Sequence, residues 1–236
     1  MTYVKKNLFF KSLILKRKKI IFLLTNSFER GTISNNQERE GFVMKKLVEE
    51  ITNRIKLHHE LYSIPVADLM WEEILFKSLK KVGDNGATWD AGSHAIGADV
   101  TNSKYGDISC KTGAKTYVKK LDSTFIKING SRTTKHKTIE EKKKFFAIKK
   151  EDVYFCLARN KKEWEFGQKK YYLSIFKTLN HAKLEWKETF GKNGKSTGWS
   201  ASSDEMKCKI SKSMSDQLWT EVKEDYIDAE YPITIR

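Results

Sequence analysis

The sequence has few of the residues that mark linkers and covalent cross-links. Its 236 residues include only two prolines, which argues against an architecture rich in linkers. There are three cysteines, Cys110, Cys156 and Cys208, an odd number at wide spacing. This pattern provides neither a disulfide framework nor a Cys-x-x-Cys metal site, and it favours a reducing compartment.

An apolar run long enough to cross a bilayer is also missing. The N-terminal stretch NLFFKSLILKRKKIIFLLTN has two apolar patches, but the basic cluster Lys16–Lys19 separates them into short pieces. A signal peptide places its charges before a single apolar stretch and small residues at its cleavage point, and neither condition holds cleanly here. We therefore expect a cytoplasmic protein.

Acidic residues are scarce relative to basic ones. The chain has 45 Lys and Arg against 30 Asp and Glu, a formal net charge of +15. Such a balance favours a polyanionic partner, although charge alone does not distinguish DNA, RNA or an anionic membrane. Aromatic residues make up 12% of the chain and include six tryptophans, which is typical of a folded protein rather than a basic tail.

The composition changes near Met44, so we divide the chain into residues 1–43, an N-terminal extension that can be poorly ordered, and a single domain, residues 44–236. Two interpretations of the extension stay open. Either the natural product starts at Met44, or residues 1–43 form an ordinary strand or helix that packs on the domain.

Hydrophobic spacing predicts the main elements of the domain. Helices are expected from Met44 to about His59 and from Val66 to Val82, the second with Asp68 as a capping residue. A basic helix is expected over 139–150. Strands are predicted over residues 98–102, 107–112, 124–128, 153–159, 170–177 and 205–211, with Ser103–Gly106 as a hairpin turn. The run VYFCLAR at 153–159 is typical of a buried central strand. The order predicts an α/β (α+β) domain with a mixed central β-sheet flanked by helices.

The run GADVTNSKYGDISCKTG, from Gly97 to Gly113, carries the strongest chemical signal. It places Asp99 on one predicted strand and Ser109-Cys110-Lys111 on the next. Side chains alternate along a strand, so Ser109 and Lys111 share a face. Mg²⁺ prefers oxygen ligands and needs only one or two carboxylates besides a carbonyl and water. If pairing brings Asp99 to that face, Asp99 and the carbonyl of Cys110 can hold Mg²⁺ while Lys111 orients water or stabilises negative charge.

This order of elements and residues resembles the PD-D/ExK nuclease superfamily, and in size and layout it is most similar to a type II restriction endonuclease. The resemblance covers roughly Val66 to Lys111. It implies a restriction-endonuclease-like core, a metal-binding role for Asp99 and a catalytic role for Lys111. Ser109 stands at the middle acidic position of the motif, and Ala98 stands at the position of its proline.

The neutral Ser109 removes a charge, so another carboxylate is expected to compensate. The candidates are Glu72 and Glu73 on the preceding helix and Asp107 at the start of the strand. Glu73 has Lys77 four residues later and suits an exposed ion pair. Glu72 shares its side of the helix with Leu75, Phe76 and Leu79, so we favour Glu72 as the second metal ligand, while Asp107 stays an alternative.

The segment from Asn129 to Thr138 groups Arg132, Lys135, His136 and Lys137 with hydroxyl and amide side chains. It suits backbone and base contacts in a DNA groove, and a solvated basic loop is an equal alternative. Residues 191–200 lack the spacing of a nucleotide-binding P-loop and are interpreted as a flexible loop that can contact DNA. His94 is a candidate phosphate contact or a turn residue. Trp199 and Trp219 are assigned to the core or an interface rather than to base stacking.

The sequence therefore predicts a Mg²⁺-dependent type II restriction endonuclease that hydrolyses double-stranded DNA without a covalent intermediate. Because symmetric DNA sites favour two-fold proteins, a homodimer is expected. A cognate DNA methyltransferase is expected as functional partner. The alternatives are a non-catalytic nucleic-acid-binding protein and a DNA-repair or mobile-element nuclease of the same fold.

Overall fold

The computed structural model describes residues 33–89, 98–148 and 151–235. The chain divides into two compact units, residues 1–46 and 47–236, and the sheet and candidate site both belong to the second. The helices of the described chain are α2 (Ile33–Leu61), α3 (Asp68–Lys81), α4 (Ile139–Ile148) and α5 (Lys161–Glu165). None of them combines the length and apolar character needed to span a bilayer.

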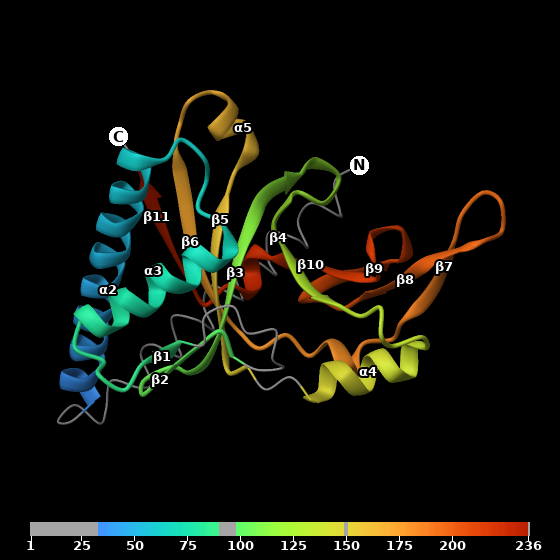
Figure 1. The fold of residues 1–236 in the computed structure, drawn as a ribbon, viewed down its shortest axis with the longest axis horizontal. Helices are drawn as coiled ribbons and strands as arrows, with labels where there is room; N and C mark the ends of the chain where they lie inside the picture. The colour runs from blue at the N-terminus through green and yellow to red at the C-terminus, as the bar shows by residue number, and fades with distance from the viewer. Residues whose placement is uncertain (1–32, 90–97, 149–150, 236) are drawn as a thin grey trace, which may run out of the picture. The chain divides into compact units, whose positions relative to one another are not determined.

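An 11-stranded mixed sheet forms the body of the second unit (Figure 1). Its strands are β1 (Thr88–Trp89), β2 (Val100–Asn102), β3 (Gly106–Val118), β4 (Ser123–Arg132), β5 (Val153–Arg159), β6 (Lys170–Lys177), β7 (Lys187–Phe190), β8 (Ser196–Ser202), β9 (Met206–Ser211), β10 (Gln217–Lys223) and β11 (Ala229–Thr234). The spatial order is β11-β6-β5-β3-β4-β10-β9-β8-β7, with β2 also paired to β3 and β1 to β2. Strands β3 and β5 run parallel, whereas the other pairs are antiparallel. The predicted mixed sheet flanked by helices is confirmed.

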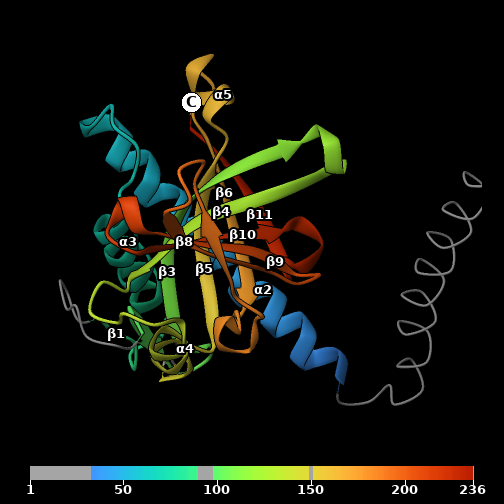
Figure 2. The same cartoon turned by 90° about the vertical axis from the view of Figure 1, so that its right-hand side faces the viewer.

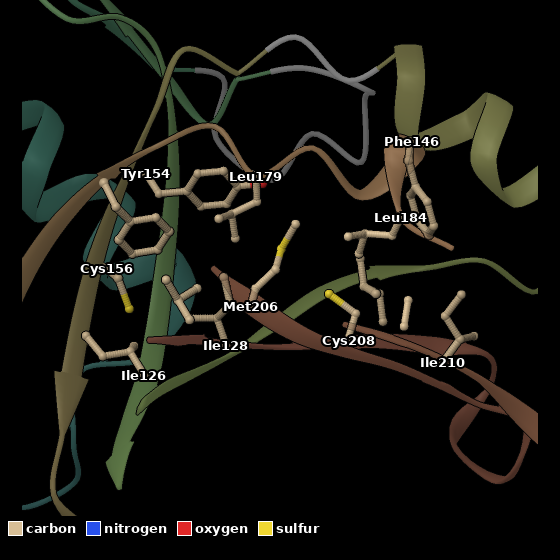
Figure 3. Packing of buried hydrophobic residues seen from close by; sticks show 14 of the residues in the cluster. Ile126, Ile128, Phe146, Tyr154, Cys156, Leu179, Leu184, Met206, Cys208 and Ile210 are labelled. Carbon is tan, nitrogen blue, oxygen red and sulfur yellow. The ribbon is translucent and has the colours of Figure 1, made fainter. Parts of the chain in front are cut away.

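Strand β5 is central, as its apolar run predicts, and its alternating side chains belong to two layers. On one face, α3 covers the sheet: Trp71 is fully buried and its indole N–H donates to the carbonyl of Phe155 at 2.9 Å. On the other face, Tyr154 and Cys156 join Ile126 and Ile128 of β4 and Phe146 of α4 in one core cluster (Figure 3). Burying this much apolar surface is the main force that holds the layers together.

The far ends of β3 and β4 form a hairpin that projects from the sheet (Figure 2). Its turn is the short helix Lys119–Leu121 followed by Asp122, whose φ of 47° is left-handed. Tyr117 and Leu121 are exposed there. Strand β3 is thus longer than its predicted span of 107–112, because it pairs first with β2 and then with β4.

Three other local expectations were wrong. Helix α2 begins at Ile33, eleven residues before the predicted start at Met44. Ala67, not Asp68, is the N-cap of α3, and it makes no side-chain cap hydrogen bond. Residues 191–200, predicted to be a flexible loop, form the turn and most of β8 in the β7–β8 hairpin.

Gly198 explains why that hairpin was missed. Its φ is +139°, and a Cβ at this position would overlap the backbone carbonyl of Ile210 on β9. Glycine is rare in strands unless another backbone approaches closely. Gly198 therefore reflects close packing between strands and not a loop.

Candidate active site

The predicted motif lies at an edge of β3 where two partner strands, β2 and β4, separate; we call this place the fork of the sheet. Residues 106–108 pair with β2 and residues 113–118 pair with β4, both on the edge opposite β5. Between them, residues 109–112 have no strand paired to this edge within the described chain. Their main-chain polar groups on that edge need other partners, because an unpaired buried N–H or C=O is costly.

Side chains supply those partners. The N–H of Cys110 donates to Oδ2 of Asp99 at 2.7 Å, and the carbonyl of Cys110 accepts from Nζ of Lys111 at 2.9 Å. Asp99 is fixed in turn because its own N–H donates to the carbonyl of Ile108 at 2.9 Å. The fork therefore brings Asp99 together with the main chain of Cys110 and the side chain of Lys111.

Lys111 and Asp99 form an ion pair of 3.0 Å between Nζ and Oδ2, and their side chains are 20% and 25% exposed, so solvent reaches both. Burial by itself lowers the pKa of Lys111, but the charge and hydrogen bond of Asp99 outweigh it, and the pKa is raised above its ordinary value. The lysine therefore stays protonated at neutral pH. It can stabilise negative charge, but it cannot accept a proton as a base.

Ser109 and Cys110 contribute differently from each other. Ser109 is buried, and its hydroxyl donates to Oδ2 of Asp99 over a long 3.4 Å. Burial raises the pKa of the Cys110 thiol well above its ordinary value, so the sulfur stays protonated. Only the main chain of Cys110 is suited to take part in the site.

Of the candidate carboxylates on α3, Glu72 is the one whose pKa responds to the charge of Asp99. Its Oε2 accepts from the indole N–H of Trp89 at 3.3 Å. Burial raises the pKa of the Glu72 carboxyl and the negative charge of Asp99 raises it further, while the Trp89 hydrogen bond acts in the opposite direction. A carboxyl whose pKa is raised by burial and by a neighbouring negative charge is typical of a site that a cation completes.

The other two carboxylate candidates have different partners. Glu73 forms an ion pair with Lys77 at 2.5 Å on the outer side of α3, as its spacing predicts. Oδ1 of Asp107 accepts from the hydroxyl of Thr101 at 3.0 Å, and no contact between Asp107 and Asp99 is described. Glu72 is therefore the best supported of the three.

Sequence reasoning missed the place of Asp68 at this site. The carboxylate of Asp68 accepts the N–H of Thr112 at 3.0 Å and also the Thr112 hydroxyl, so it pairs with the fork instead of capping its own helix. Its position four residues before Glu72, on the same side of α3, was the available signal. No comparable signal pointed to Trp89.

The donor set at the fork suits a hard divalent cation. Nζ of Lys111 already bonds both the Asp99 carboxylate and the Cys110 carbonyl, so two oxygen donors converge on a cationic group. A carboxylate and a carbonyl are the ligand types that Mg²⁺ prefers, and the charge of Glu72 also acts on this site. No cluster of three or more His, Cys, Asp or Glu side chains suited to a metal occurs in the described chain. Any Mg²⁺ here would thus depend on the carbonyl and on water.

The predicted DNA-contacting segment lies at the end of β4 and in the loop before α4. Arg132, Lys135 and Lys137 are exposed, whereas His136 is half-buried and its ring stacks on Phe145 at 4.8 Å. Lys142 is fully buried beneath the loop and donates to the carbonyl of Thr133 and to Asp216, each at 2.9 Å. The loop is therefore tied to the fold with its basic side chains outward. His94 lies outside the described residues.

The two remaining tryptophan assignments differ in outcome. Trp199 is buried in the core cluster, as expected. Trp219 is half-buried on the opposite face of the sheet, where it lines a hollow. It is therefore not a core residue.

Comparison of the chain with protein-family models, with curated proteins and with solved structures finds no match.

Proposed function

We propose that this protein is a Mg²⁺-dependent endonuclease for double-stranded DNA, of the type II restriction class in the PD-D/ExK superfamily. One observation carries the proposal: the Asp99 carboxylate and the Cys110 carbonyl converge on the Lys111 ammonium at the fork of the sheet, beside Glu72. The net charge of +15 supports a polyanionic substrate.

In this proposal Asp99, Glu72 and the carbonyl of Cys110 would hold the metal. When bound, Mg²⁺ supplies charge neutralisation at the phosphate and a more acidic water. The ammonium of Lys111, held protonated by Asp99, stabilises the negative charge that develops on the phosphate oxygens. Water attacks directly, because the thiol of Cys110 is protonated and the hydroxyl of Ser109 is buried. Ser109 tunes the charge of the site through its contact with Asp99.

Several wider features belong to the same proposal. Arg132, Lys135, His136 and Lys137 contact DNA, two copies of the chain form a homodimer, and a cognate methyltransferase protects the host DNA in the cytoplasm. A DNA-repair or mobile-element nuclease of the same fold would share the chemistry without the methyltransferase.

A second candidate function is non-catalytic nucleic-acid binding. The observation that favours it is that Asp99 and Lys111 also satisfy the main-chain groups freed by the fork, so the same contacts suit a structural role. Such a protein would keep its affinity for nucleic acid without a need for a metal.

Incubation of the purified protein with unmethylated plasmid and Mg²⁺ separates the two candidates. The nuclease proposal expects discrete fragments and no cleavage when EDTA is added. An unaltered plasmid together with a stable gel-shift complex would favour the binding protein and contradict the nuclease.

A further inference from the structure

The face of β4, β10 and β9 that points away from the core cluster is hollowed and basic. A hollow of about 380 Å³ lies on it, and a second of about 370 Å³ lies at its border with β3 and β5; both are lined by Lys127 and Trp219. Lys207 and Lys209 line the first. Thr112 lines the second; its side chain points to the opposite face of β3 from that of Lys111, and it is hydrogen-bonded to Asp68 of α3. We call this surface, defined by Lys127, Lys207, Lys209 and Trp219, the lysine groove.

Strand register explains why these side chains gather. Lys127 of β4, Glu221 of β10 and Lys207 of β9 form one cross-strand row, and Asn129, Trp219 and Lys209 form the next. Neighbours in a row are roughly 5 Å apart across strands, and the two rows lie roughly 7 Å apart along them. The alternate residues, such as Ile128, Thr220 and Cys208, point to the buried side.

The positive charges of the three groove lysines are not neutralised by ion pairs within the described chain. None of the three forms an ion pair within the described part of the chain, and Glu221 is the single carboxylate among the residues that line the groove. Lys127 and Lys209 are exposed and Lys207 is half-buried. The ammonium of Lys127 lies 4.8 Å from the centre of the Trp219 ring, which holds this long side chain over the groove. The surface is therefore complementary to a polyanion.

Trp219 adds a hydrogen-bond donor to this surface. Its indole N–H has no partner among the described residues, whereas four of the other tryptophans donate theirs to the protein. A half-buried indole with an unused donor, between lysines, suits a phosphate oxygen better than an apolar partner.

We propose that the lysine groove binds the sugar–phosphate backbone of DNA next to the cleaved phosphate. The inference rests on the proposed function, since it names a contact surface for the same substrate. Together the two hollows extend from Thr112, which is bonded to Asp68 of α3, across β4 and β10 to β9, a span of roughly 15 Å at the spacing of strands. Phosphate contacts of this kind fix the register of the duplex and carry no base specificity.

Fluorescence anisotropy with a labelled DNA duplex tests the proposal, with Ca²⁺ in place of Mg²⁺ so that binding is measured without cleavage. The test variant replaces Lys127, Lys207 and Lys209 by alanine, and a second variant replaces them by arginine. The charge-matched control replaces Lys56, Lys161 and Lys162, which are exposed and do not line the groove.

Each lysine that neutralises a phosphate contributes about 1 to the slope of log affinity against log salt concentration. We expect the alanine variant to lose about 3 from this slope and to bind at least tenfold more weakly at low salt, by the same phosphate-contact argument. The arginine variant should bind like wild type, and the control should keep the wild-type slope. An unchanged slope in the alanine variant, or an equal loss in the control, would overturn the groove.

These outcomes separate the groove from the proposed function. A wild-type protein that binds through the groove lysines without cutting plasmid would refute the nuclease and leave the groove standing. Cleavage by wild type, together with an unchanged slope in the alanine variant, would support the nuclease and refute the groove. A wild-type protein that binds no DNA at all would contradict both.

Discussion

Asp99 is the residue on which the candidate site depends, because one carboxylate oxygen accepts hydrogen bonds from Ser109, Cys110 and Lys111. Lys111, the other charged residue of the motif, forms an ion pair with Asp99, so each side chain holds the other in place. The neutral Ser109 leaves the site with less negative charge than a second motif carboxylate would provide. We propose that Glu72, whose pKa responds to the charge of Asp99, restores it.

Glu72 and Glu73 form a natural matched pair for testing this assignment. We expect Glu72→Gln to lower the rate of Mg²⁺-dependent DNA cleavage by at least about tenfold, the lower end of effects seen when a metal site loses a supporting carboxylate. Glu73→Gln should leave the rate unchanged, because its carboxylate pairs with Lys77 on the outer side of the helix. Single-turnover cleavage assays measure both, and equal rates for the two variants would refute the role of Glu72.

The raised pKa of Glu72 also predicts a pH effect on stability that needs no activity assay. An acid whose pKa is higher in the folded state favours folding when it is protonated, and this contribution is lost as the pH rises through the folded pKa. In EDTA, Glu72→Gln should therefore gain stability relative to wild type as the pH is raised from about 4 to about 7. Thermal melts across this range check the trend, and a difference that is constant with pH would contradict it.

At the scale of elements, the β2–β3 hairpin sets the position of Asp99. Gly106 begins β3 with φ at +71°, a conformation that costs a residue with a side chain about 1–2 kcal/mol. We expect Gly106→Ala to lower stability by at least about that amount, because a Cβ here would also overlap the carboxylate of Asp152, and to reduce cleavage, because the hairpin carries Asp99 against Cys110.

Gly194 is a close control for this effect. It has the same φ of +71° but lies in the β7–β8 turn with open space around it. Gly194→Ala should cost only the contribution of the backbone conformation, about 1–2 kcal/mol, and leave cleavage unchanged. Chemical denaturation and cleavage assays on both variants provide the comparison, and a loss of activity in both would show that the hairpin has no special role.

Buried Lys142 anchors the loop that carries Lys135 and Lys137. Breaking a buried ion pair from one side typically costs about 3–5 kcal/mol, so we expect Lys142→Met to be strongly destabilised. The double variant Lys142→Met with Asp216→Asn should recover part of the loss, since no uncompensated charge then remains. Urea denaturation measures the stability of both variants. A double variant less stable than the single one would contradict this role of the Lys142–Asp216 ion pair.

The elements also show what sequence patterns can and cannot predict. The apolar run of β5 and the spacing of Asp99 and Lys111 involve residues close together in the chain, so the sequence indicates both. The bond between Asp68 and Thr112 joins residues 44 positions apart, and the fork that requires it appears only once β2 and β4 diverge. Gly198 suggested a loop because a glycine is needed there only for close contact with the backbone of β9, and that contact forms only in the folded sheet.

At the scale of the whole molecule, the net charge of +15 and the candidate site at the fork support the same proposed function, the binding and hydrolysis of DNA. The basic side chains gather in at least two places, the lysine groove and the loop before α4, on opposite faces of the sheet. A homodimer would double these surfaces, and sedimentation analysis should find a mass about twice the 27.5 kDa of one chain. A monomer that cuts both strands would contradict the dimer.

The most direct test of the central claim is a comparison of wild type with Asp99→Asn and Lys111→Met on the same unmethylated plasmid. In Mg²⁺ we expect wild type to give discrete fragments and both variants to give none. In Ca²⁺ we expect all three to bind duplex DNA with similar affinity, since neither variant removes a groove lysine. Full cleavage by either variant would contradict the site.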